Sequence, residues 1–155
     1  MHIFYKKLFT IKKLFTILVS LLVTVSVYSQ TYEVNKFYPE LGVYVIKTDG
    51  TKGVVVAMQD QGAANWSDAE AMVNDASKHD ANGAKFNYLR LPTIDELKLV
   101  YLLKQSIGGF MDTYYWSSTW DAYGAVWILQ FGGNGNQPDN ESARNVFCVR
   151  AVRDF

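Results

Sequence analysis

The residue types that perform catalysis or bind metals are sparse in this sequence. The two histidines, His2 and His79, are far apart, and no group of His, Cys and Glu has the spacing of a zinc site. No nucleophile-elbow glycine pattern surrounds any serine, and the "GGNGN" run lacks the lysine and the following helix of a phosphate-binding loop. The single cysteine, Cys148, lies in an apolar run, which favours a buried structural thiol over a nucleophile. We therefore expect a protein that is not an enzyme and that has no catalytic, metal or cofactor site.

A run of aromatic and hydroxyl side chains, "YYWSSTWDAYG", is the first candidate for ligand binding. Aromatic faces beside amides and carboxylates are a common way for proteins to hold sugars and peptides. Trp120 and Tyr123 lie in an expected loop together with Asp121, so we predict that these three residues belong to a ligand surface. Trp116 and Trp127 lie in apolar runs typical of strands, so we expect both in the core.

A long polar loop, "GGNGNQPDNESARN", is the second candidate. Long ordered loops on a rigid scaffold often carry function. Its "QPD" tripeptide resembles the one that supplies calcium and sugar ligands in animal C-type lectins, and oxygen-rich neighbours suit calcium. The second ligand motif that those lectins place downstream is missing, so a polar turn is the default interpretation. The candidate ligand residues in this loop are Asn134, Asn136, Gln137 and Asn140.

The first 29 residues have the pattern of a secretory signal peptide. Four lysines and no acid precede a short apolar run, which ends at small residues suited to cleavage before Gln30. The apolar run is shorter than the roughly 20 residues of a membrane-spanning helix, although an uncleaved anchor is the alternative. No cysteine follows it, so a lipoprotein is not expected. We predict a secreted, periplasmic or cell-surface protein with no stable membrane span after cleavage.

The remaining chain has the size and charge of one acidic domain. The leader holds four of the 15 Lys and Arg residues and none of the 15 acids, so residues 30–155 carry a formal charge of −4. This balance argues against a nucleic-acid partner, whose binding surface would be basic. We expect a lead-in segment over 30–41 and one domain over 42–155.

The secondary structure expected in this domain begins with a hairpin and a helix. Two β-branched runs, Val43–Lys47 and Val54–Met58, flank glycine-rich turn residues, which is typical of a β-hairpin. Helical spacing of apolar residues follows over 65–80, and Ser67 with Glu70 predicts a capping box at its start.

A second helix and three strands complete the expected elements. Thr93 with Glu96 forms another predicted capping box, just after Pro92, and the helix that follows is apolar over a broad arc. Strands are expected for "YYWSST", "AVWILQF" and "FCVRAVR". The helix and the strands look like framework, and the loops between them are where specificity would lie.

Five of these motifs in order, "NWSDAEAM", "YLRLPTIDEL", "YYWSST", "AVWILQF" and "VRAVRDF", resemble the Lcl C-terminal domain family over roughly residues 42–155. The resemblance implies an α+β, C-type-lectin-like fold related to formylglycine-generating enzymes and to the variable proteins of diversity-generating retroelements. Two helices would pack on a small twisted antiparallel sheet, with the first and last strands close together. Its ligand-facing positions would be Trp120, Asp121, Tyr123, Asn134, Asn136, Gln137 and Asn140.

The family likeness implies adhesion or ligand binding by an exported protein. The catalytic cysteines of formylglycine-generating enzymes have no counterpart here, because Cys148 is alone. We therefore expect a non-enzymatic binding or adhesion module whose partner is an extracellular glycan or protein. The alternative is a structural subunit that packs against other exported proteins.

Overall fold

The computed structural model describes residues 30–79, 81, 86–133 and 137–155. Residues 31–155 form one compact unit with an α+β fold, which confirms the predicted class. The expected signal peptide, residues 1–29, lies outside the described residues. None of the described helices is long and apolar enough to span a membrane.

The first sheet has the strand order β1-β2-β3-β9, and all of its pairs are antiparallel. The predicted hairpin is confirmed as β2 and β3. The segment expected to be a lead-in belongs to this sheet, because β1 pairs with β2 and buries Tyr38. The C-terminal strand β9 pairs with β3 and forms the edge of the sheet opposite to β1, so the first and last strands share a sheet but are not neighbours. The bounds are β1 Lys36–Tyr38, β2 Val43–Thr48, β3 Gly53–Val56 and β9 Val152–Asp154.

The second sheet has the order β4-β8-β5-β6-β7, so the expectation of one small antiparallel sheet is wrong. Its pairs are antiparallel except β5 and β8, which run parallel and pair at Tyr115 and Cys148. The strand β7 lies in the "QPDNE" stretch, where the sequence predicts only a loop. The bounds are β4 Gly62–Ala64, β5 Tyr114–Trp120, β6 Val126–Gln130, β7 Pro138–Glu141 and β8 Phe147–Val149.

The predicted strand "FCVRAVR" divides at Arg150 into β8 and β9, which belong to different sheets. The side chain of Arg150 is fully buried and bonds to groups outside the strands. The next backbone N–H, that of Ala151, donates to Gln61 Oε1 at 2.6 Å. The last apolar run of the chain therefore joins the two sheets.

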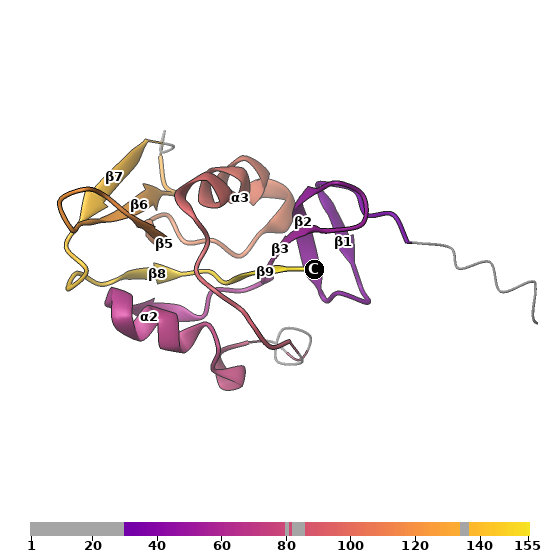
Figure 1. Cartoon of the computed structure of the whole chain (residues 1–155), viewed down its shortest axis with the longest axis horizontal. Helices are drawn as coiled ribbons and strands as arrows, with labels where there is room; N and C mark the ends of the chain where they lie inside the picture. Colours follow the sequence, from indigo (N-terminus) through magenta and orange to yellow (C-terminus); the bar gives the residue numbers. More distant parts are fainter. Residues whose placement is uncertain (1–29, 80, 82–85, 134–136) are drawn as a thin grey trace, which may run out of the picture. The chain divides into compact units, whose positions relative to one another are not determined.

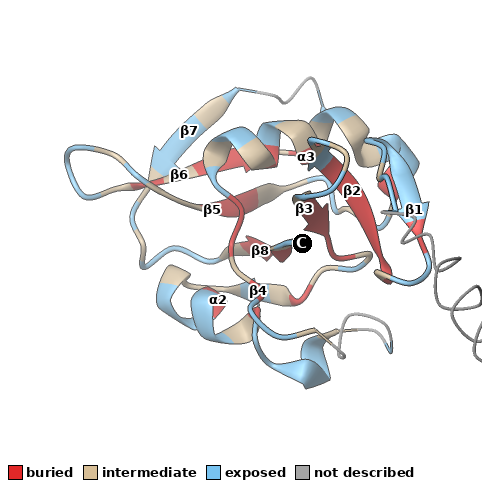
Figure 2. Cartoon of the chain, turned by 45° about the vertical axis from the view of Figure 1, so that its right-hand side comes forward, coloured by how far each residue is buried: buried red, intermediate tan, exposed pale blue. Residues whose placement is uncertain are grey.

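The helices α2 (Trp66–Met72) and α3 (Ile94–Ile107) cover opposite faces of the second sheet. Side chains alternate across a strand, so Tyr115 packs with α3 while its neighbour Trp116 packs with α2. Figure 1 shows the helices on either side of the strands β8 and β9. Figure 2 shows that the buried residues gather on the strands between them.

The helix starts differ in how well the sequence predicts them. The capping box of α3 is confirmed, because Thr93 Oγ1 accepts from the Glu96 N–H and the Glu96 carboxylate accepts from the Thr93 N–H. The capping box expected at Ser67 is wrong, because Asn65 is the N-cap of α2 and its Oδ1 accepts from the Asp68 N–H at 3.1 Å. The helix α2 ends at Met72, and a 3₁₀ turn over Ala76–Lys78 follows.

Candidate ligand-binding cleft

The hydroxyl groups of "WSST" are used by the framework. Thr119 Oγ1 accepts the N–H of Ile94 at 3.0 Å, which satisfies a donor in the first turn of α3. Ser118 donates its N–H to Pro92 O at 2.7 Å, and Ser117 Oγ donates to Trp127 O at 2.6 Å. These bonds join β5 to the "LPT" segment and to β6, so these hydroxyls are committed to positioning the strand.

Two tryptophans form an aromatic corner at the end of β5. The rings of Trp66 and Trp120 meet edge to face, with centroids 4.8 Å apart and planes 73° apart. The Trp66 indole N–H donates to Ser117 O at 2.9 Å, and its backbone N–H donates to Ala143 O at 3.0 Å. Trp66 is therefore held both by its ring and by its backbone. Trp120 stays 45% exposed.

This aromatic corner forms a wall of a surface cleft of about 450 Å³. The volume lies within the range of roughly 300–1,000 Å³ that is typical of ligand pockets. Three separate chain segments meet here, namely the start of α2, the end of β5 and the β7–β8 loop. The lining residues are Asn65, Trp66, Ser67, Trp120, Ala143 and Arg144.

A tight turn next to the cleft is held by Asp121. Its Oδ1 accepts the backbone N–H groups of Tyr123 and Ala125 at 2.8 and 2.9 Å, and its Oδ2 accepts from Asn140 Nδ2 at 2.8 Å. Asp121 and Asn140 therefore hold the turn against β7. Tyr123 lies in this turn and is 96% exposed, so its side chain is accessible from solvent.

The structure brings together only part of the predicted ligand surface. Trp120, Asp121, Tyr123 and Asn140 lie at one end of the second sheet, where Glu141 and Trp120 both pair with Val126. Gln137 precedes the opposite end of β7, where Pro138 pairs with Leu129. Asn134 and Asn136 lie outside the described residues.

Several residues that line the cleft are not among the ligand-binding residues predicted from the sequence. Trp66 and Ser67 lie in the segment expected to form a framework helix, and Arg144 is not predicted to bind. Nothing in the local sequence indicates that α2 and the β7–β8 loop meet. The expectation that Trp127 is a core residue is wrong, since it is partly exposed and belongs to none of the buried clusters. Trp116 is buried as predicted and donates its indole N–H to Ala64 O at 2.8 Å.

The geometry of the "QPD" stretch is that of an edge strand. Asp139 accepts the N–H of Asn140 with its own carboxylate, at 2.8 Å. Within the described ranges, no three His, Cys, Asp or Glu side chains are grouped so that they could hold a metal ion.

The buried polar groups form an ionic centre that stabilises the fold. Arg150 Nε lies 2.6 Å from Asp60 Oδ1, and Tyr115 donates its hydroxyl to Asp60 Oδ2 at 2.6 Å. The guanidinium also donates to the carbonyl oxygens of Ala57 and Gly109. Burial, and then the hydrogen bond to Asp60, raises the pKa of Tyr115 well above its ordinary value.

The buried thiol of Cys148 lies near this ionic centre. Burial, and then the charge of Asp60, raises the pKa of Cys148 to about 11. The thiol is 3% exposed, as expected for a structural cysteine. A protonated and covered thiol does not act as a nucleophile at neutral pH.

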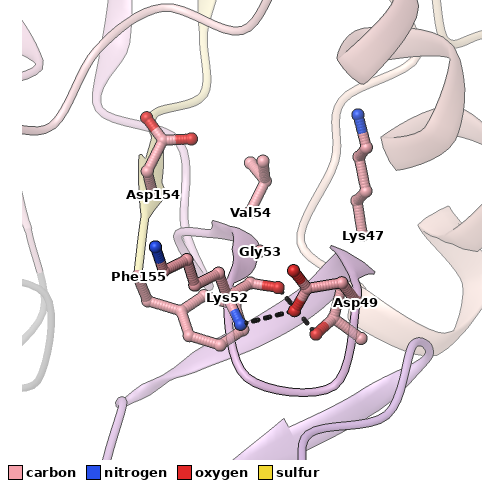
Figure 3. A pocket seen from close by; sticks show the side chains of 8 residues that line it. Lys47, Asp49, Lys52, Gly53, Val54, Asp154 and Phe155 are labelled. Carbon is pink, nitrogen blue, oxygen red and sulfur yellow. Dashed lines mark hydrogen bonds between the residues drawn. The ribbon is translucent and has the colours of Figure 1, made fainter.

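A second hollow, of about 420 Å³, lies at the β2–β3 hairpin. Its Asp49 carboxylate accepts the backbone N–H groups of Lys52 and Thr51, and these bonds, that of Lys52 first, lower the pKa of Asp49. Figure 3 shows the side chains of Lys47 and Lys52 standing apart across the hollow. Because its carboxylate is committed to the turn and its lysines do not converge, this hollow is a weaker candidate than the cleft.

Comparison of the sequence with protein-family models and with curated proteins finds no match.

Proposed function

We propose that this protein is an exported, non-enzymatic binding module with a C-type-lectin-like fold, and that it holds a saccharide in the Trp66–Trp120 cleft. The observation that carries the proposal is the exposed ring of Trp120, braced edge to face by the fixed ring of Trp66. An exposed indole costs free energy in water, and the C–H face of a sugar ring covers it while the sugar hydroxyls stay solvated.

The cleft is held in place before any ligand arrives. The Trp66 ring is anchored by its indole N–H, and the β7–β8 loop is anchored through Ala143 O. The Asp121 turn keeps the end of β5 in one geometry. A ligand therefore orders few side chains on binding, which lowers the entropic cost of recognition.

The proposed fold and export are supported by other features. Two helices on opposite faces of a sheet fit a C-type-lectin-like arrangement. The basic and then apolar leader supports export.

A glycan array with the purified protein, with and without calcium, tests the proposal. We expect Trp120→Ala to weaken binding about 30-fold, since a central tryptophan contributes about 2 kcal/mol. Trp127→Ala is the matched control, because this partly exposed tryptophan lies on the same sheet but outside the cleft. Equal binding by the wild type and Trp120→Ala would rule out the cleft as the site.

A structural subunit is the second candidate function. It is favoured by an apolar hollow of about 260 Å³ beside α3, where Leu102 is 70% exposed next to Tyr101 and Leu129. Exposed apolar surface of this kind often marks contacts between proteins. A stable oligomer in light scattering that Leu102→Glu dissociates would favour this function over saccharide binding.

A further inference from the structure

We infer that the ligand of the cleft is an acidic saccharide, whose carboxylate pairs with Arg144 while its ring lies on Trp120. This inference rests on the proposed saccharide function and narrows it to one chemical class. It starts from the one cationic side chain that lines the cleft.

Arg144 differs from the other three arginines of the chain. Arg90 pairs with Glu96 and Asp154, and Arg150 pairs with Asp60. Arg153 stacks on Phe86, with its guanidinium carbon 4.1 Å from the ring centre. Within the described part of the chain, the Arg144 side chain has neither a hydrogen bond nor an ion pair.

The loop that presents Arg144 is well anchored. Its preceding residue, Ala143, accepts the backbone N–H of Trp66 at 3.0 Å. On the other side, Asn145 donates its N–H to Ser142 O at 2.9 Å and its side-chain amide to Glu141 Oε2 at 2.8 Å. The guanidinium is therefore presented from fixed backbone.

Two acids that lie close in sequence to lining residues of the cleft accept hydrogen bonds from amides. Asn65 Nδ2 donates to Asp68 Oδ2 at 2.7 Å, and Asn145 donates to Glu141. Arg144 is the charged residue of the cleft lining, and its guanidinium has no partner among the residues that the structure describes. Such a cation beside an aromatic wall favours a ligand with a negative charge, although the domain as a whole is acidic.

The shape of the anion follows from guanidinium chemistry. The planar fork of arginine donors matches the two oxygens of a carboxylate, and the bonds are strengthened by both charges. Asp68 follows the lining residue Ser67, and Glu141 lies two residues before Ala143. Their negative charge disfavours ligands with several negative charges. A sugar with one carboxylate, such as a uronic or a sialic acid, fits the cleft best.

The test compares matched pairs of oligosaccharides, each uronic or sialic acid glycan beside its carboxyl-reduced form. Binding to the full protein is followed by array fluorescence and by the NMR shift of the Trp120 indole N–H. We expect the acidic member to bind about five- to tenfold more tightly, which is modest because the pair is partly solvated. Arg144→Gln should remove this preference, by lowering the affinity for the acidic member to that for the reduced member.

Lys98→Gln is the control, because this surface cation lies on α3 and pairs with Asp95, its one ion-pair partner among the described residues. It should keep the preference for the acidic member. Equal affinity for both members in the wild type, or a preference that survives in Arg144→Gln, overturns the inference while saccharide binding itself stands. Equally tight binding of a sulfated analogue overturns the assignment to a carboxylate.

Binding of no saccharide, with no shift of the Trp120 signal, overturns the proposed function together with this inference. Binding of a peptide with a free C-terminal carboxylate in place of any sugar also overturns both, and would indicate a role in assembly with other proteins.

Discussion

The replacement of Arg150 by methionine is predicted to be the most damaging single change among the buried polar residues. Methionine keeps an unbranched apolar stem but is shorter than arginine and carries no charge. The change removes the ion pair with Asp60 and the hydrogen bonds to Ala57 O and Gly109 O. The guanidinium carbon also leaves its place 3.8 Å from the centre of the Phe110 ring.

The expected cost follows from what stays behind. Asp60 remains largely buried, with its side chain 13% exposed, and keeps only the Tyr115 hydroxyl as a close partner in the ionic centre. Removing one partner of a buried pair typically costs about 3–5 kcal/mol, because the other charge is left uncompensated. For a domain of this size, that cost lowers the melting temperature by roughly 10–20 °C.

The assay is urea and thermal unfolding followed by circular dichroism, with Arg153→Met as the matched control. Arg153 lies three residues further on, and its Nε and Nη2 atoms have no hydrogen-bond partner within the described residues. Burial lowers the pKa of Arg153, so its charge is already disfavoured there. We expect the control to cost less than about 1 kcal/mol. A loss at Arg150 no larger than that at Arg153 would refute the role of the ionic centre.

Two further predictions concern titratable groups. Burial alone would raise the pKa of Glu96, but the hydrogen bonds from Arg90 and the Thr93 N–H outweigh it and lower the pKa below the ordinary 4.5. The stability that ionised Glu96 contributes is therefore present above pH 4.5 and is lost as the pH falls through its lower folded pKa. Glu96→Gln should flatten the acid side of a plot of unfolding free energy against pH. An unchanged slope in this variant would contradict the prediction. Cys148 should resist alkylation at pH 7.5 until urea unfolds the protein. Its pKa of about 11 keeps the thiol protonated, and its burial keeps the reagent away. Rapid labelling of the folded protein would contradict this prediction.

Local signals in the sequence were sufficient for part of the fold. The hairpin of β2 and β3 and the capping box of Thr93 and Glu96 depend on residues a few positions apart, so their patterns can be read directly. The burial of Trp116 follows from its place in an apolar run. The α+β class, which the family resemblance implied, agrees with the helices and strands of the structure.

The features that the sequence did not predict depend on distant contacts. Asp60 and Arg150 are 90 positions apart, and nothing local indicates that they pair or that the last apolar run divides at Arg150. The strand β7 is polar and forms because β6 offers it an open edge. The cleft has the same origin, since Trp66, Trp120 and Arg144 come from three chain segments.

The ionic centre that stabilises the fold and the candidate cleft lie at different positions along β5. The ionic centre contacts β5 at Tyr115, whereas the cleft lies at Trp120, five residues further along the strand. At about 3.3 Å per residue, the two are roughly 16 Å apart, beyond the distance at which substitutions usually couple. Trp66 and Trp120 are only partly buried, and the framework bonds of β5 run through Ser117, Ser118 and Thr119. The exposed side chain of Trp120 can therefore vary without loss of the fold, whereas Trp66 is tied to Ser117 O. A loss of binding in Trp120→Ala would then report on contact with a ligand.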